Sequence, residues 1–150
     1  MWKVYDYLIN KKIISKKQKI SIIGNSFGGT TLLGIPRLIK SASSIIMIGS
    51  GCGKKPGTTK PLLSTLPEEE ILLRAINSFT GNFAFIRGKN DLVVPEESQN
   101  KIIKNTGSAK ISLLLNINKA NHDLSPENNK IKINRAKIIS NTLKMINFSI

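Results

Sequence analysis

Four short apolar runs, separated by segments with helical features, constrain the fold of this chain more than any other feature. They span Lys19–Gly24, Ser43–Gly49, Asn82–Arg87 and Lys110–Ile117, and they are rich in Ile, Leu and Phe. Short apolar runs of this kind are typical of strands that are buried on both faces in a parallel sheet. Strands that alternate with helices form right-handed βαβ units. The sequence therefore predicts an α/β fold, with a four-stranded, mostly parallel sheet flanked on both faces by helices.

The segments between these runs carry helix signals. Trp2–Ile14 has apolar residues near helical spacing, and Phe27 to about Ile39 reads as a helix that Pro36 kinks or ends. Thr65 and Glu68 have capping-box spacing, which predicts a helix from there to about Phe79. Pro95-Glu96-Glu97 starts another helix, and Ile131–Phe148 is predicted to be a closing amphipathic helix.

Length and composition indicate one globular domain over residues 1–150. Hydrophobic residues make up 40% of the chain, and no apolar run approaches the ~20 residues that a membrane helix needs. The first residues do not resemble a signal peptide. Cys52 is the single cysteine, so an internal disulfide is impossible and a reducing, cytoplasmic location is expected.

The net charge of +14 raises the alternative of a basic nucleic-acid-associated protein. The excess is mostly Lys scattered along the chain. Arg, which forms bidentate hydrogen bonds with phosphates and with base edges, is scarce. Aromatic residues, on which bases stack, are 5% of the chain. These features favour solvated Lys-rich faces over a nucleic-acid partner.

The strand Lys19–Gly24 runs directly into Gly24-Asn25-Ser26-Phe27-Gly28, and a helix follows. This is G-x-S-x-G in the strand–turn–helix setting of a nucleophile elbow, in which small flanking residues allow a tight, strained turn that exposes the serine. Ser26 is the candidate nucleophile, and the backbone N–H of Phe27 is the candidate oxyanion donor. The alternative is a Gly-rich turn without chemistry.

A serine nucleophile needs a base, and a base of this kind needs an orienting carboxylate. His122 is the single histidine and lies just past the fourth run, while Asp91 follows the third. Both positions are carboxyl ends of predicted parallel strands, where ligands of open α/β sheets bind. Asp91 could instead cap an Asx turn, and Asp123 is a competing acid next to His122. Cys52 lies in no such turn and is not expected to be a nucleophile.

The ordered motifs G-N-S-F-G-G, G-K-N-D-L-V-V-P and A-N-H-D resemble those of the α/β-hydrolase family over nearly the whole chain. The resemblance implies a Ser26–Asp91–His122 triad, with neither a metal nor an organic cofactor. It also implies that this chain corresponds to the C-terminal, catalytic half of the fold, so that the N-terminal strands and the loop with the second oxyanion donor are expected to be missing.

The expected function is that of a serine hydrolase, which cleaves an ester, thioester or amide of a small acyl substrate through an acyl-enzyme. A catalytically inactive fragment or an interaction module is the alternative. A separate polypeptide could supply the missing strands. Without them, the first strand is expected at an exposed sheet edge, with weak activity and poor solubility. Lys54, Lys55 and Lys60 lie in the loop after the second strand, which makes an anionic substrate one alternative.

Overall fold

The computed structural model describes residues 2–15, 18–54, 57, 59–126 and 133–148. The strands are β1 (Ile20–Asn25), β2 (Ala42–Ile48), β3 (Asn82–Gly88) and β4 (Ile111–Ile117). The helices are α1 (Trp2–Asn10), α2 (Phe27–Leu33), α3 (Pro36–Ser41), α4 (Pro61–Ser64), α5 (Glu69–Asn77), α6 (Glu96–Lys104) and α7 (Arg135–Phe148). No helix among these residues is long and apolar enough to cross a membrane.

The four strands form one sheet in the order β1-β2-β3-β4, and every neighbouring pair is parallel. This confirms the predicted α/β class and the predicted strand order. Because the strands are parallel, their carboxyl ends lie along one edge of the sheet, so the turns that follow β1, β3 and β4 come together there.

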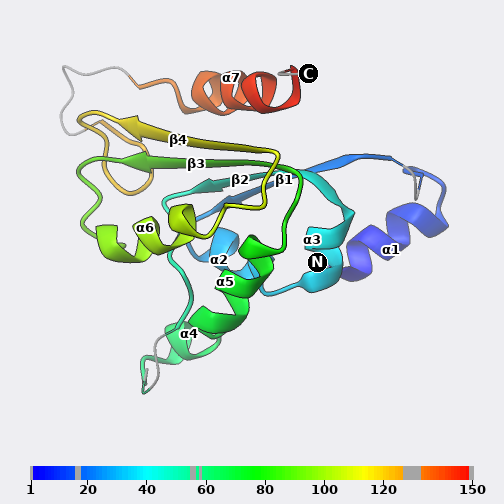
Figure 1. Ribbon diagram of the computed structural model, residues 1–150, viewed down its shortest axis with the longest axis horizontal. Coiled ribbons are helices and arrows are strands. Elements are labelled where there is room, and N and C mark those ends of the chain that lie inside the picture. Colours follow the sequence, from blue (N-terminus) through cyan, green and yellow to red (C-terminus); the bar gives the residue numbers. More distant parts are fainter. Residues whose placement is uncertain (1, 16–17, 55–56, 58, 127–132, 149–150) are drawn as a thin grey trace.

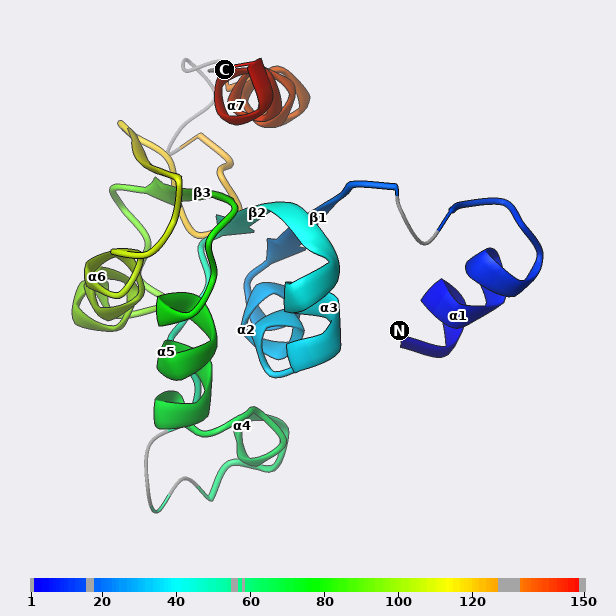
Figure 2. The same ribbon diagram turned by 45° about the vertical axis from the view of Figure 1, so that its right-hand side comes forward.

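Helices cover both faces of the sheet, as Figures 1 and 2 show. On one face, α2, α3, α5 and α6 pack against a core that includes Met47, Phe83 and Phe85. On the other face, α7 packs against Ile46 and its neighbours on β3. The alternation of side chains along each strand explains this division, because successive residues point to opposite faces.

Two helix predictions are wrong in their boundaries. The predicted Phe27–Ile39 helix is two helices, because α2 ends before Gly34 and Pro36 begins α3. The predicted capping box at Thr65 does not open a helix: Thr65 lies in a turn after α4, and α5 begins at Glu69, after Glu68, whose extended backbone forms a bridge with Lys54. The start predicted for the last helix, Ile131, lies outside the described residues.

Strand β1 lies at an edge of the sheet, as the sequence predicted, and pairs with β2 along one side. Its residue Ile23 is 43% exposed, although it belongs to an apolar strand. An exposed apolar strand at a sheet edge can pair with another chain.

We expect Ile23→Lys to reduce self-association of the protein without loss of stability, because a lysine on an edge strand opposes pairing with another strand. Sedimentation velocity over a concentration series measures this. Ile71→Lys is the matched control, because Ile71 is also 43% exposed but lies on α5. If both substitutions reduce self-association equally, the added positive charge, and not the position of Ile23 at the sheet edge, causes the change.

Candidate active site

Ser26 lies in the tight turn between β1 and α2. Its backbone has φ 50° and ψ −127°, a positive-φ conformation that residues other than glycine adopt rarely. The turn is fixed by the Ser26 N–H, which donates to the carbonyl of Ile48 at 2.7 Å. A strained backbone held in this way is common at functional sites and presents the side chain at the carboxyl edge of the sheet.

The small residues around the turn allow α2 to approach β1 closely. A Cβ on Gly24 would lie 2.4 Å from Gly29 Cα, and one on Gly29 would lie 2.1 Å from Ser50 Oγ, so neither position has room for a side chain. The sequence-based explanation for Gly28 is wrong, because a Cβ there would meet nothing within 4 Å. The steric requirement falls on Gly24 and Gly29.

Asp91 lies in the turn after β3, and its two carboxylate oxygens have separate partners. Oδ1 accepts the backbone N–H groups of Val93 at 2.9 Å and Val94 at 3.1 Å, which is an Asx-type turn. Oδ2 lies 2.9 Å from His122 Nδ1. The carboxylate therefore makes both kinds of contact that the sequence left open, the turn through Oδ1 and the contact to the imidazole through Oδ2.

The side chain of Asp91 is 3% exposed. Burial by itself would raise its pKa, but the hydrogen bonds from His122, Val94 and Val93 outweigh burial and lower the pKa below its ordinary value. The carboxylate therefore remains ionised near neutral pH and can orient and stabilise the imidazole.

His122 lies in the loop after β4, which is folded back on the ends of β3 and β4. Asn90 N–H donates to Ala120 O at 2.9 Å, and buried Leu124 anchors the loop. A Cβ on Gly88 would lie 2.1 Å from Asn121 O, so the backbones approach closely behind the imidazole. This packing directs His122 Nε2 to within 2.7 Å of Ser26 Oγ.

The structure thus brings Ser26, His122 and Asp91 into one hydrogen-bonded chain, although they are far apart in the sequence. Asp123, the competing acid, contacts Ser125 through both of its oxygens. Phe27 is the first residue of α2, so its N–H has no intrahelical acceptor and can donate to a ligand. No group of three or more His, Cys, Asp or Glu side chains among the described residues could hold a metal ion.

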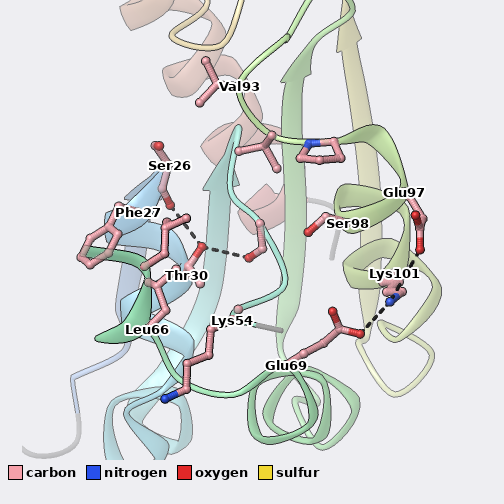
Figure 3. Close-up of a pocket in the computed structure, with 15 residues that line it drawn as sticks. Ser26, Phe27, Thr30, Lys54, Leu66, Glu69, Val93, Glu97, Ser98 and Lys101 are labelled. Carbon is pink, nitrogen blue, oxygen red and sulfur yellow. Dashed lines mark hydrogen bonds and ion pairs between the residues drawn. The ribbon is translucent and has the colours of Figure 1, made fainter. Parts of the chain in front are cut away.

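A pocket of about 330 Å³ opens beside Ser26, between α2, α6 and the segments around α4 and Val93 (Figure 3). Phe27, Leu66 and Val93 give it apolar lining, and Thr30, beside Ser26, contributes a hydroxyl that donates to the carbonyl of Gly51. The far end is lined by charged residues, among them Glu69 and Lys101. Figure 3 shows this charged end well separated from Ser26.

Sequence analysis missed two features of this site. One is Gln99 on α6, which is 1% exposed and donates from Nε2 to Asp91 Oδ2 at 2.8 Å. The other is the ion pair between Glu69 on α5 and Lys101 on α6. The sequence offers one signal for the first, because Gln99 lies three residues before Ile102 and so shares the apolar face of that helix. Nothing in the sequence indicates that Glu69 and Lys101 contact each other.

Comparison with known proteins supports the fold. No protein-family model matches the chain, and no curated protein matches it. Among solved structures, dienelactone hydrolase from Anabaena variabilis superposes with a TM-score of 0.63 at 15% identity, over 94% of this chain and 55% of that one. An esterase from Pyrococcus furiosus gives a TM-score of 0.62 at 18% identity, over 97% and 60%. The esterase domain of a Rhodothermus marinus protein gives 0.54 at 15% identity, over 70% and 53%.

The chain has an α/β-hydrolase fold and spans part of it. It covers 53% of the Rhodothermus marinus esterase domain and 65% of a monoacylglycerol lipase from Paleococcus ferrophilus.

Proposed function

We propose that this chain is the catalytic part of a serine hydrolase that cleaves an ester, thioester or amide through an acyl-enzyme. The observation that carries the proposal is the chain of contacts from Ser26 Oγ to His122 Nε2 at 2.7 Å and from His122 Nδ1 to Asp91 Oδ2 at 2.9 Å. A hydroxyl, an imidazole and a carboxylate in this order, within hydrogen-bond reach, form an activated nucleophile.

In the first half-reaction, Ser26 Oγ attacks the carbonyl carbon of the substrate while His122 Nε2 takes the hydroxyl proton. Asp91 holds the imidazole in the tautomer with a proton on Nδ1 and stabilises the imidazolium that forms. The tetrahedral intermediate then collapses. The bond to the leaving group breaks, and His122 gives its proton to that group as it departs.

In the second half-reaction, water attacks the acyl-enzyme. His122 takes a proton from the water, the ester bond to Ser26 breaks, and Ser26 recovers its proton as the acid leaves. The Phe27 N–H donates to the oxyanion in both halves.

Phe27 supplies one oxyanion donor, and a second donor typically contributes ~10²–10³-fold in rate. We therefore propose slow turnover for the chain by itself and faster turnover with a polypeptide that supplies a second donor and pairs with β1 on the side where the described part of the chain places no strand. An inactive fragment or interaction module is the competing proposal, favoured by the exposed edge at Ile23.

Labelling with a fluorophosphonate probe separates the two proposals. An activated serine reacts with the probe and can be located by mass spectrometry on the peptide that contains Ser26. No labelling, with the protein folded as judged by circular dichroism, would favour the inactive module.

A further inference from the structure

We infer that the acyl chain of the substrate lies in the pocket beside Ser26. His122 must protonate the leaving group, so the leaving group lies on the His122 side of the carbonyl. The pocket beside Ser26 is lined by Phe27, Thr30 and Val93 among others, and His122 is not among its lining residues. The acyl chain, which stays bonded to Ser26 Oγ in the acyl-enzyme, therefore occupies this pocket.

The charged groups at the far end of the pocket are already paired. Lys101 Nζ lies 2.7 Å from Glu69 Oε1 and 3.7 Å from Glu97 Oε1. The other oxygen of Glu69 accepts the thiol of Cys52 at 2.9 Å. Lys54 donates to the carbonyl of Ser64 at 3.2 Å. Because these side chains already contact one another or a backbone carbonyl, a charged group on a substrate finds no unpartnered ion among them.

The buried thiol behind this end adds no charge. Burial and the hydrogen bond to Glu69 raise the pKa of Cys52, so it remains a protonated donor. Its neighbour Ser98 accepts the Cys52 N–H at 3.0 Å, which fixes α6 against the segment after β2. The far end of the pocket is therefore bounded by charged groups that are already paired with one another, partly in contact with solvent.

The formal charges of the pocket residues cancel. The lining includes two lysines, Lys54 and Lys101, and two glutamates, Glu69 and Glu97. The chain as a whole carries +14, so this balance is local and does not follow from the composition. An anionic acyl group would have to displace Glu69 from Lys101, whereas an alkyl chain gains from apolar burial without breaking an ion pair.

We propose that Glu69 and Lys101, which bound the far end of the pocket, determine specificity by selecting uncharged acyl chains of short to medium length over acyl chains that end in a carboxylate. This inference rests on the proposed serine hydrolase function. It replaces the anionic substrate that the lysines of the 51–61 loop had suggested. At about 330 Å³ the pocket is at the small end of the range for ligand sites, which limits chain length.

The test compares two series of 4-nitrophenyl esters, one of straight-chain monocarboxylic acids from acetate to decanoate, and one of half-esters of dicarboxylic acids of matched length. We expect kcat/KM in the first series to rise roughly fourfold per methylene until the pocket is full and then to level off or fall. At matched length, the half-esters should be at least tenfold poorer.

Glu69→Gln is the decisive variant. It leaves Lys101 with Glu97, whose side chain is 73% exposed, so the far end gains a net positive charge. The ratio of kcat/KM for the half-ester to that for the neutral ester should rise about tenfold, which corresponds to about 1.4 kcal/mol. Glu70→Gln removes the same charge from the same helix, but Glu70 is 79% exposed, pairs with Arg74 and lies outside the pocket, so the ratio should not change.

A wild-type preference for half-esters, or equal ratios for Glu69→Gln and Glu70→Gln, would overturn this assignment. A second arm needs no turnover: binding of hexanamide and of the monoamide of adipic acid to Ser26→Ala is measured by NMR titration. Tighter binding of the hexanamide supports the selectivity even without ester hydrolysis, and tighter binding of the anion overturns it. Fluorophosphonate labelling reports separately on the proposed function.

A second inference concerns Gln99 and rests on different contacts. Asp91 Oδ2 accepts two hydrogen bonds, from His122 Nδ1 at 2.9 Å and from Gln99 Nε2 at 2.8 Å. Gln99 belongs to α6, which begins after Pro95, and is buried beside the carboxylate. The hydrogen bond from its amide fixes the orientation of Oδ2 toward the imidazole. It also stabilises part of the negative charge of the carboxylate.

We infer that Gln99 is a positioning residue for the proposed reaction and acts through Asp91. Other charged groups near the carboxylate are Arg87, Lys89 and Glu96, which line the small cavity behind it; Arg87 is paired with Glu96 at 3.0 Å. Among the contacts of the Asp91 carboxylate, the Gln99 amide is the one side-chain donor besides His122 in the described part of the chain.

We expect Gln99→Met, which keeps the length but lacks the N–H, to lower kcat about tenfold with KM little changed. The acidic limb of the kcat/KM profile should move to higher pH, because the carboxylate, without the Gln99 hydrogen bond, interacts more strongly with the imidazolium that forms in the reaction. Gln99→Glu should be poorer than Gln99→Met near neutral pH, because it places a second carboxylate against Asp91.

Thermal denaturation of each variant monitors folding. A lower kcat at every pH, with the acidic limb of the kcat/KM profile unmoved, would show that Gln99 has only a structural role and would overturn the inference. Unchanged kinetics in both variants would overturn it as well.

Discussion

Replacing Ser26 with alanine is expected to abolish ester hydrolysis and fluorophosphonate labelling while the fold remains intact. Removing a serine nucleophile of this kind lowers kcat by roughly 10⁴-fold or more, because no other group can form the acyl-enzyme. The turn should survive, since the bond from Ser26 N–H to Ile48 O uses the backbone alone. Hydrolysis of a 4-nitrophenyl ester and labelling followed by mass spectrometry measure the effect.

Ser21→Ala is the matched control for this experiment. Ser21 lies on β1, the strand that leads into the turn, but it is exposed and lies five residues before Ser26. We expect wild-type labelling and wild-type hydrolysis in this variant. If Ser26→Ala is labelled as strongly as the wild type, Ser26 is not the nucleophile and the proposed mechanism is wrong.

Asp91→Asn should lower kcat by about 10⁴-fold with little change in the overall fold. Oδ1 could still accept the N–H groups of Val93 and Val94 in the asparagine variant, so the turn should persist. The amide nitrogen would then face two donors, His122 Nδ1 and Gln99 Nε2, and the imidazole would lose the tautomer that leaves Nε2 free to accept the Ser26 proton.

The control for this substitution is Asp123→Asn. Asp123 adjoins His122 in the sequence and carries the same charge, but its carboxylate contacts Ser125 and is exposed. Activity and the pH profile should be those of the wild type. Comparable losses in both variants would mean that negative charge near His122, and not the Asp91 contact, supports the reaction.

The elements of the fold were largely predictable from local sequence. Buried parallel strands have to be apolar on both faces, so the four runs stand out, and their predicted bounds differ from the observed ones by one residue at most at each end. The helix boundaries were harder. The predicted helix over Phe27–Ile39 ignored Gly34, and the capping box at Thr65 was overridden by the bridge between Lys54 and Glu68.

The candidate residues Ser26, Asp91 and His122 were predictable because each follows a strand, and the carboxyl ends of parallel strands share one edge. The hydrogen-bond partners of Asp91 were only partly predictable from the sequence. The sequence presented an Asx turn and an orienting carboxylate as alternatives, and the structure uses one oxygen for each. The prediction that both glycines of the motif are needed for space was correct for Gly24 and wrong for Gly28. A side chain at Gly29, and not at Gly28, would collide with Ser50.

The sequence by itself determined which segments become strands, in what order they pair, and which serine, acid and histidine follow them, because these depend on periodicity and on short motifs. Tertiary structure decided which side chains meet across elements. Glu69 reaches Lys101 from a different helix, and Gln99 reaches Asp91 from the helix that follows its turn. Such contacts depend on how α5 and α6 pack on the sheet, on rotamers and on burial, and these arise only when distant parts of the chain are folded together.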